Sequence, residues 1–236
     1  MTELVSYAFA DGVATLTMDD GKANAMGPAM QAALNAAFDR AEADKAIVVL
    51  AGRPGVFSGG FDLGVFKAGD ARTTFQMLTG GAQLAQRLLS YPHPVIAACS
   101  GHAVAMGLFL LQCADVRIGL KTGATFQANE VLIGMTLPHF ALETIRQRVA
   151  TPHLFLVGTA TPYAGEGAVN AGLLDEAVAP DALAAAVQAQ VERLKKANPA
   201  SFTATKQRLR APVLAALPGA IEQDIVDWKR MGAAKV

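Results

Sequence analysis

Short apolar runs between amphipathic helices constrain the fold of this chain most strongly. Ala46–Ala51, Pro94–Cys99 and Val116–Leu120 have the length and apolar character of strands buried in a parallel sheet. Pro28–Ala43 carries apolar side chains at helical spacing, and Arg72–Leu89 is also expected to be a helix. Because helices that alternate with such strands serve as crossovers, the pattern predicts the α/β class.

The two ends of the chain depart from this central pattern. Asp11-Gly12 lies between two apolar segments and predicts a β-hairpin. The last third is mainly helical. Within it, Ser201–Arg210 and Ala220–Met231 are expected as separate helices, because Pro212 and Pro218 lie between them. Ser201 is expected to cap the first of these two helices.

The change of pattern near Pro180 divides the chain into an α/β core, residues 1–180, and a helical region, residues 181–236. That region can fold back on its own core or pack on a neighbouring subunit, and the sequence leaves both open. Hydrophobic residues make up 52% of the chain and charged residues 17%, with a mean hydropathy of +0.31. Since a monomer would expose much of this apolar surface, we expect a homo-oligomer.

Charge, cysteines and segment lengths exclude several classes of protein. Lys and Arg number 20, as do Asp and Glu, so no basic face for nucleic acid is expected. Cys99 and Cys113 lie in or beside apolar stretches and are expected to be buried thiols, with no metal site. Val95–Cys99 and Ala103–Leu111 are too short to span a membrane, and no signal-peptide pattern opens the chain. A cytoplasmic protein without membrane binding is expected.

Three segments are candidates for carrying chemistry. Phe57–Leu63 contains adjacent glycines whose backbone N–H groups can face an anion, although an ordinary strand-to-helix turn has the same pattern. Ser100–Gly107 precedes a buried helix whose first N–H groups are free donors, and His102 within it is either a base or structural. Thr125–Gly134 contains Glu130, which is a proton shuttle if buried and a surface side chain otherwise.

In their order and spacing these segments resemble the crotonase (enoyl-CoA hydratase/isomerase) superfamily, and the resemblance extends from Val5 to Leu217. Further matching pieces are Lys22-Ala23-Asn24-Ala25-Met26, Pro94-Val95-Ile96-Ala97-Ala98, Cys113-Ala114-Asp115-Val116-Arg117 and Gly172-Leu173-Leu174-Asp175-Glu176. The resemblance implies a spiral of ββα units with a helical C-terminal region, assembled as a homotrimer or dimer of trimers. It also implies an acyl-CoA substrate bound by the core, with no separate cofactor.

By position in this resemblance, the backbone N–H groups of Phe61 and Met106 would stabilise the thioester oxyanion, and Glu130 would move the proton. Hydratases of the family use a second glutamate, and that position is Phe109 here, which cannot hold a water molecule. The resemblance therefore predicts an isomerase of fatty acid metabolism that converts 3-enoyl-CoA to 2-enoyl-CoA. An enoyl-CoA hydratase and a non-catalytic acyl-CoA-binding homologue are the alternatives.

The resemblance also implies where the substrate would bind. The expected substrate-binding residues are Lys22, Ala23, Asn24, Asp62, Leu63, Phe109 and Lys206. Lys206, on the C-terminal helix, would contact a phosphate of coenzyme A. For Lys22 and Lys206, an ordinary solvated surface lysine is the alternative.

Overall fold

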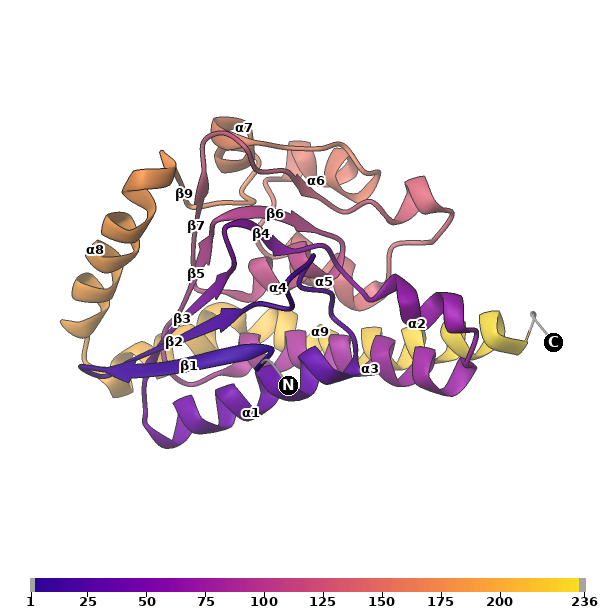
Figure 1. Ribbon diagram of the computed structural model, residues 1–236, viewed down its shortest axis with the longest axis horizontal. Coiled ribbons are helices and arrows are strands. Elements are labelled where there is room, and N and C mark those ends of the chain that lie inside the picture. Colours follow the sequence, from indigo (N-terminus) through magenta and orange to yellow (C-terminus); the bar gives the residue numbers. More distant parts are fainter. Residues whose placement is uncertain (1–2, 234–236) are drawn as a thin grey trace.

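A six-stranded sheet, called sheet A here, forms the centre of the molecule (Figure 1). Its strands are, in spatial order, β1 (Val5–Ala10), β2 (Val13–Met18), β3 (Ile47–Gly52), β5 (Val95–Cys99), β7 (Val116–Leu120) and β9 (Glu176–Val178). Neighbouring strands pair in parallel, except in the antiparallel hairpin of β1 and β2. This computed structural model describes residues 3–233, with side-chain surroundings as far as Arg230.

The hairpin turn confirms the prediction made from Asp11-Gly12. Ala10 pairs with Val13 across a two-residue loop, and both loop residues have positive φ, 51° for Asp11 and 76° for Gly12. Two consecutive positive φ values define the type I′ turn, whose twist matches that of the flanking strands. Asp and Gly tolerate this conformation better than other residues, so the dipeptide fixes the register of the hairpin.

A second, three-stranded parallel sheet, sheet B, consists of β4 (Gly55–Ser58), β6 (Gly101–Val104) and β8 (Phe126–Gln127), in that order. Each of its strands directly follows a strand of sheet A, so the chain passes from sheet A to sheet B and then to a helix, three times in succession. This repetition confirms the spiral of ββα units. The segment from Phe57, expected as a turn, therefore begins inside a strand of sheet B.

Helices cover the sheets and form most of the C-terminal third. The α-helices are α1 (Pro28–Ala43), α2 (Leu63–Ala68), α3 (Ala71–Ser90), α4 (Met106–Cys113), α5 (His139–Arg146), α6 (Thr151–Gly158), α7 (Gly165–Asn170), α8 (Leu183–Lys195) and α9 (Pro199–Ala233). Two short 3-10 helices, η1 (Glu130–Ile133) and η2 (Pro180–Ala182), complete the set that the described residues form. Bounds of α1 and β7 coincide with the predicted segments.

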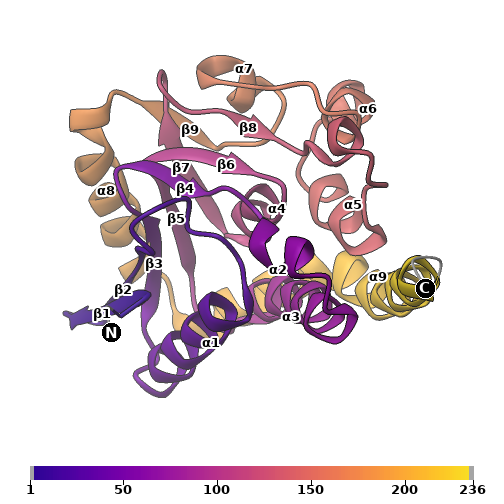
Figure 2. The ribbon, with the colours of Figure 1, turned by 45° about the vertical axis from the view of Figure 1, so that its right-hand side comes forward.

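Both faces of sheet A are covered, as the apolar runs predict. One face packs under α8, where Val49, Ile96 and Ile118 of the sheet meet Val187 and Val191 of the helix. Side chains that alternate with these along the strands, such as Val48 and Leu50, belong to the main core. In Figures 1 and 2, α8 lies on one side of sheet A, and α1, α3, α4 and α9 lie on the other. The helical region therefore packs on its own core.

The expectation of two separate C-terminal helices is wrong, because α9 runs unbroken through Pro212 and Pro218. Both prolines lie on the exposed face of α9, where water can hydrate the carbonyl groups that lose their helical partners. The buried face, which includes Val213 and Leu217, packs against α3 and α5 and holds the helix together. The expectation that Ser201 caps this helix is also wrong. Asn198, directly before the first residue of α9, is the cap, because its Oδ1 accepts from the Ser201 N–H at 3.0 Å.

Candidate functional site

The three candidate segments meet at one edge of sheet B. Strand β4 ends at Ser58 and leads to Phe61, β6 ends at Val104 and leads to Met106, and β8 ends at Gln127 and leads to Glu130. Since the three strands are parallel neighbours, their carboxyl ends lie side by side (Figure 2). Ligands of parallel sheets bind at such carboxyl ends. The fold thus brings together the three residues that the sequence assigned to catalysis.

The turn after β4 is held by buried polar groups. The Ser58 hydroxyl donates to the carbonyl of Asn24 at 2.8 Å and accepts from the N–H of Gly60 at 3.2 Å. The Met26 N–H donates to the Gly60 carbonyl at 2.8 Å. Gly60 has a φ of +100°, and a Cβ there would lie 2.8 Å from the Cβ of Ala105. Only glycine can occupy this position, because both the backbone conformation and the close approach exclude a side chain.

The turn after β6 carries a strained residue. Ala105 has φ 49° and ψ −124° and is the N-cap of α4, with its N–H donating to the Gln127 carbonyl at 2.9 Å. Non-glycine residues in such positive-φ regions cost about 1–3 kcal/mol, and they concentrate at functional sites. This conformation turns the chain sharply from β6 into α4 and presents the Met106 N–H at the helix N-terminus.

The two turns place their N–H groups together. A Cβ on Gly60 would be 3.5 Å from the Met106 nitrogen, so the Phe61 N–H, on the next peptide, lies beside the Met106 N–H. Within the described residues, neither of these N–H groups donates a hydrogen bond to another backbone or side-chain atom. Two adjacent unpaired donors, one at a helix N-terminus, form a site that favours a negatively charged oxygen.

Glu130 follows the third strand of this edge. Gln127 pairs with Val104 and accepts from Ala105, and Glu130 follows it by three residues. Because three residues span at most about 11 Å of chain, the Cα atoms of Gln127 and Glu130 lie no further apart than that. Glu130 is the first residue of η1.

The Glu130 carboxyl is buried and incompletely hydrogen-bonded. The residue is 5% exposed, and its Oε2 has no hydrogen-bond partner among the described residues. Burial raises the pKa of Glu130 from 4.5 to about 7, and a hydrogen bond to its own backbone offsets only part of the rise. A carboxyl with such a pKa exists in both protonation states near neutral pH. It can therefore accept a proton and return it.

Phe109 lies one turn into α4, and its N–H donates to the Ala105 carbonyl at 3.1 Å. Its side chain is fully buried and contacts the ring of Phe140 edge-on, with centroids 5.9 Å apart. Phe140 in turn packs against Trp228 of α9. Asp224, on the same helix, accepts from the N–H groups of His139 and Phe140 at 2.7 and 2.8 Å. Helix α9 therefore anchors the start of α5 behind Phe109, and Phe109 supplies no group that could hold water.

The remaining predicted residues of the N-terminal segments lie beside the first turn. Lys22 and Ala23 are exposed, and the Ala23 carbonyl accepts from the Gly59 N–H at 2.8 Å. Asp62 caps α2 by accepting from the Gly64 N–H at 2.7 Å, and Leu63 is 58% exposed.

Asn24 has a structural role in this chain. Its side chain is fully buried, with its Nδ2 donating to the carbonyls of Met18 and Phe57 at 3.0 and 3.1 Å and its Oδ1 accepting from Asp20. The amide thus ties the Lys22–Met26 segment to the ends of β2 and β4. It has no free group for a substrate, although its backbone lies beside the site.

The expectation for Lys206 is wrong. Its side chain is 6% exposed, and its Nζ donates to Asp115 Oδ2 at 2.7 Å and to the His93 carbonyl at 3.1 Å. Asp115 also accepts from Arg210 at 2.7 Å and from the N–H of Val95, the first residue of β5. The cluster therefore lies at the amino end of β5, roughly 13–16 Å of strand from the carboxyl end that leads to β6. Lys206 is committed to a buried ion pair and cannot reach the site.

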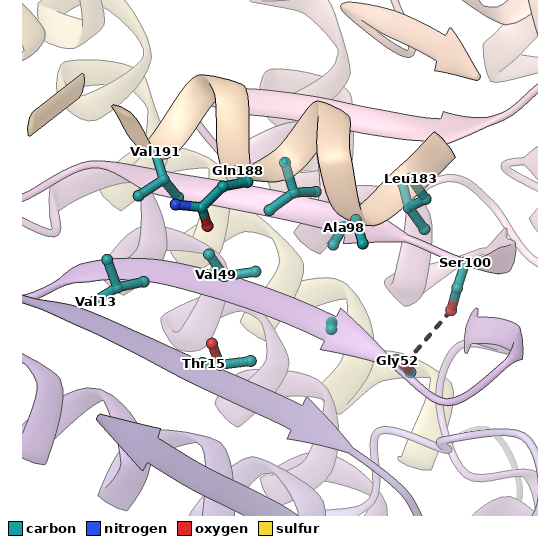
Figure 3. Close-up of a pocket in the computed structure, with 12 residues that line it drawn as sticks. Val13, Thr15, Val49, Gly52, Ala98, Ser100, Leu183, Gln188 and Val191 are labelled. Carbon is teal, nitrogen blue, oxygen red and sulfur yellow. Dashed lines mark hydrogen bonds between the residues drawn. The ribbon is translucent and has the colours of Figure 1, made fainter. Parts of the chain in front are cut away.

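A cavity of about 320 Å³ lies elsewhere, between α8 and the outer face of sheet A (Figure 3). Its walls are mainly apolar, with Val49 and Ala98 on the sheet and Val187 on the helix. The Ser100 hydroxyl at its end donates to the carbonyls of Arg53 and Gly52, at 2.9 and 3.4 Å. No titratable side chain lines this cavity, so it offers no acid or base.

Two site features escaped the sequence reasoning. The backbone strain at Ala105 could not be predicted from the sequence, because alanine is not a residue type that indicates a positive φ, and only the backbone geometry reveals it. Gly80-Gly81 in the middle of α3 was a visible signal, since glycine is unfavourable inside a helix. A Cβ on Gly81 would lie 2.5 Å from the ring of Phe61, so this glycine is part of the architecture of the site.

The spiral of ββα units with a long C-terminal helix is the crotonase fold. Comparison with known proteins agrees, since the profile of the enoyl-CoA hydratase/isomerase family matches residues 8–235. The chain therefore belongs to the enoyl-CoA hydratase/isomerase family, and it is a crotonase-family enzyme, isomerase or hydratase.

Solved structures of several relatives resemble the chain over nearly its whole length. An enoyl-CoA hydratase/isomerase family protein from Pseudomonas syringae is 45% identical and covers 94% of this chain and 96% of its own, with a TM-score of 0.91. A protein from Mycobacterium tuberculosis, described as an enoyl-CoA isomerase in one structure and as a probable enoyl-CoA hydratase in another, is 43% identical in the first structure and covers 96% and 99%, with a TM-score of 0.90. An enoyl-CoA hydratase from Mycobacterium marinum is 40% identical and covers 95% and 99%, with a TM-score of 0.91. No helix in the described part of the chain is long and apolar enough to cross a membrane.

Proposed function

We propose that this protein is an enoyl-CoA isomerase that converts 3-enoyl-CoA to 2-enoyl-CoA. The observation that carries the proposal is the meeting of three turns at the carboxyl edge of sheet B. There, the turn after β8 carries one buried carboxyl with a pKa of about 7, and the neighbouring turns after β4 and β6 carry two N–H groups that donate to no other described residue. This set contains one proton shuttle and one oxyanion site, which is what migration of a double bond requires.

Glu130 performs both proton transfers in this reaction. Its carboxylate removes a proton from carbon 2, and the electrons of that C–H bond form a dienolate with its charge on the thioester oxygen. The resulting carboxylic acid then returns the proton to carbon 4, and the double bond moves from carbon 3 to carbon 2. A pKa of about 7 suits both steps, because the group must act as a base and then as an acid at one pH.

The N–H groups of Phe61 and Met106 stabilise the dienolate oxygen. Both donors belong to the backbone and are held by the turn geometry, so little reorganisation is needed when charge develops. Loss of one such donor in comparable sites costs about 3–4 kcal/mol, or roughly 10²–10³ in rate. The strain at Ala105 and the positive φ of Gly60 are the backbone conformations that bring the two donors together.

Hydration is the competing reaction, and the solved relatives include an enoyl-CoA hydratase that is 40% identical to this chain. Adding water requires groups that hold and activate it in addition to a proton donor. The turn of α4 that follows the oxyanion donors presents Phe109, which is fully buried against Phe140. An apolar wall there keeps water from the dienolate, which supports isomerisation over hydration.

For the coenzyme A part of the substrate, the exposed Lys22–Ala23 segment and the neighbouring Asp62–Leu63 backbone are the proposed contacts. Lys206 takes no part, because it is buried with Asp115. Lys22 is the cation of this group, and a phosphate is the part of coenzyme A that a cation would bind.

We also propose that copies of the chain assemble as a homotrimer or dimer of trimers. Large apolar side chains remain exposed on η1 and α6, with Leu132 68% exposed and Phe155 77% exposed. Burial of such side chains between subunits would stabilise an assembly. Light scattering of the purified protein tests this, and a monomer at micromolar concentration would contradict it.

The functional proposal is tested by offering purified protein 3-enoyl-CoA and 2-enoyl-CoA side by side. We expect conversion of the first with little hydration of the second, and Glu130→Gln should lose the conversion while remaining folded. Glu166→Gln is the matched control, because that carboxylate is exposed and pairs only with the exposed Lys121. Rapid hydration of 2-enoyl-CoA would establish the hydratase instead. Binding without turnover of either substrate would indicate a non-catalytic homologue.

A further inference from the structure

Gly81 occupies an unfavourable place for a glycine. It lies in the interior of α3, a 20-residue helix, with a second glycine directly before it. A glycine inside a helix is unfavourable relative to alanine, because it loses more backbone freedom on folding. Gly81 is also buried, so it does not serve a loop or a helix end. A specific contact must therefore account for the missing side chain.

That contact involves both residues that carry the oxyanion donors. A Cβ on Gly81 would lie 2.5 Å from Cε1 and 2.7 Å from Cζ of the Phe61 ring. It would also lie 3.4 Å from the terminal methyl group of Met106. Contacts below about 3 Å are repulsive, so a side chain at this position displaces the ring. The side chains of Phe61 and Met106 thus rest together on the bare backbone of Gly81.

The adjacent Gly80 serves a different contact. A Cβ there would meet Oε1 of Gln31 at 2.4 Å, and the Gln31 amide donates to the carbonyls of Met26 and Met77. Gly80 therefore does not touch the donors directly. The clean reference for a helical glycine is Gly219 in α9, where a Cβ would meet nothing within 4 Å.

We propose that Gly81 is a positioning residue for the oxyanion site. This inference rests on the proposed function, in which the Phe61 and Met106 N–H groups bind the thioester oxygen. The Phe61 peptide lies between Gly60, at φ +100°, and Asp62, the cap of α2, so the ring is the anchor that fixes its orientation. When the ring moves away from α3, the N–H on the same residue turns with it. An oxyanion donor must lie within 2.7–3.1 Å of the oxygen, so a small rotation weakens it strongly.

The test compares Gly81→Ala, Phe61→Ala, the double variant and Gly219→Ala. Activity on 3-enoyl-CoA is measured with separate kcat and KM, and thermal melting verifies that each variant is folded. Gly81→Ala is expected to lower kcat by about tenfold to a hundredfold, with KM changed by less than about threefold. In the Phe61→Ala background the same substitution should change kcat by less than about threefold, because the ring that it displaces is gone. Gly219→Ala should match the wild type.

A second readout separates this inference from the proposed reaction. Enolisation of a bound 3-ketoacyl-CoA gives an ultraviolet band that reports the oxyanion site whether the enzyme isomerises or hydrates. A thioether analogue without the carbonyl reports binding alone. Gly81→Ala should weaken the enolate band by about tenfold or more and leave thioether affinity unchanged. If the wild type enolises the ligand but does not isomerise, the proposed function fails and the Gly81 comparison still stands.

Three results would overturn the inference. A folded Gly81→Ala variant with kcat and enolate band within about twofold of the wild type shows that the ring is not an anchor. An equal loss in the Phe61→Ala background shows that the effect does not pass through the ring. A wild type that binds the 3-ketoacyl-CoA without enolising it shows that the donors form no oxyanion site, and the role of Gly81 falls with them.

Discussion

Replacing Glu130 by glutamine should make the protein gain stability relative to the wild type as the pH rises from 5 to 8, and it should abolish activity. The carboxyl titrates near pH 4.5 in the unfolded chain and near pH 7 in the folded protein. Because the folded-state pKa is the higher one, Glu130 leaves folding unperturbed below pH 4.5 and destabilises the fold increasingly as the pH rises to 7. Above pH 7 the destabilisation is constant, since both states are ionised.

The size of the effect follows from the two pKa values. Linkage gives a destabilisation of about 1 kcal/mol at pH 5 and about 3 kcal/mol at pH 8, because each pKa unit corresponds to about 1.4 kcal/mol. Glu130 is 5% exposed, so solvent screening removes little of this. Glutamine does not titrate, and any cost of burying its amide is the same at every pH. The stability of Glu130→Gln relative to the wild type should therefore rise by about 2 kcal/mol between pH 5 and pH 8.

Urea unfolding at a series of pH values measures this difference. Glu166→Gln is the control, and its effect should stay below about 0.5 kcal/mol throughout, because the carboxylate is 69% exposed. A relative stability of Glu130→Gln that is flat between pH 5 and pH 8 would refute the reasoning. It would mean that the carboxyl is solvated in the folded protein and cannot have the pKa that a proton shuttle needs.

Three further substitutions test other parts of the structure. Ala105→Gly should raise the free energy of unfolding, measured in urea, by about 1 kcal/mol, because relief of the positive φ outweighs the greater freedom of glycine in the unfolded chain. A loss of stability would contradict the claim that the Ala105 backbone is strained. Asp115→Asn should lower the free energy of unfolding by about 3–5 kcal/mol, because it leaves the buried Lys206 without its ionised partner. The control, Asp39→Asn, changes a carboxylate that is 72% exposed and should lower it by less than about 1 kcal/mol, so equal effects would contradict the buried cluster. Pro212→Ala should raise the melting temperature, because it restores a helical N–H and adds up to about 3 kcal/mol to the free energy of unfolding. A lower melting temperature would argue against an unbroken α9.

The central layer of the fold could be predicted from the sequence because its elements have strong local signals. Val95–Cys99 is apolar throughout, and Pro28–Ala43 has helical spacing with a proline at its start, so each segment indicates its own type. Sheet B gave no such signal, since β4 and β6 have four residues each and β8 has two. Runs this short have no measurable period, and only their pairing in three dimensions defines them as strands.

The candidate site could be predicted in part, and the reason for each outcome is physical. Phe61, Met106 and Glu130 belong to segments whose order and spacing resemble a known family, and the parallel pairing of sheet B places them at one edge. The prediction for Lys206 was wrong because the environment of this lysine depends on Asp115, which is 91 residues away in the chain. A sequence shows that a lysine is charged, but it does not show whether the lysine forms an ion pair with a buried carboxylate.

The same limit explains the error at the C-terminal helix. Proline inside a helix removes one hydrogen bond, and the local rule for Pro212 correctly states this cost. It does not include the stabilisation from Leu217 and Trp228, which are buried on the opposite face of α9. Tertiary packing of that face outweighs the local penalty, so the helix continues to Ala233.

The central claim is that Glu130 alone carries the proton from carbon 2 to carbon 4 in a pocket that excludes water. The most direct measurement uses 3-enoyl-CoA deuterated at carbon 2 in a single turnover, with the position of deuterium in the product read by NMR. The account predicts 2-enoyl-CoA with deuterium retained in part at carbon 4, and no conversion by Glu130→Gln. A product without deuterium at carbon 4, together with undiminished conversion by Glu130→Gln, would contradict it.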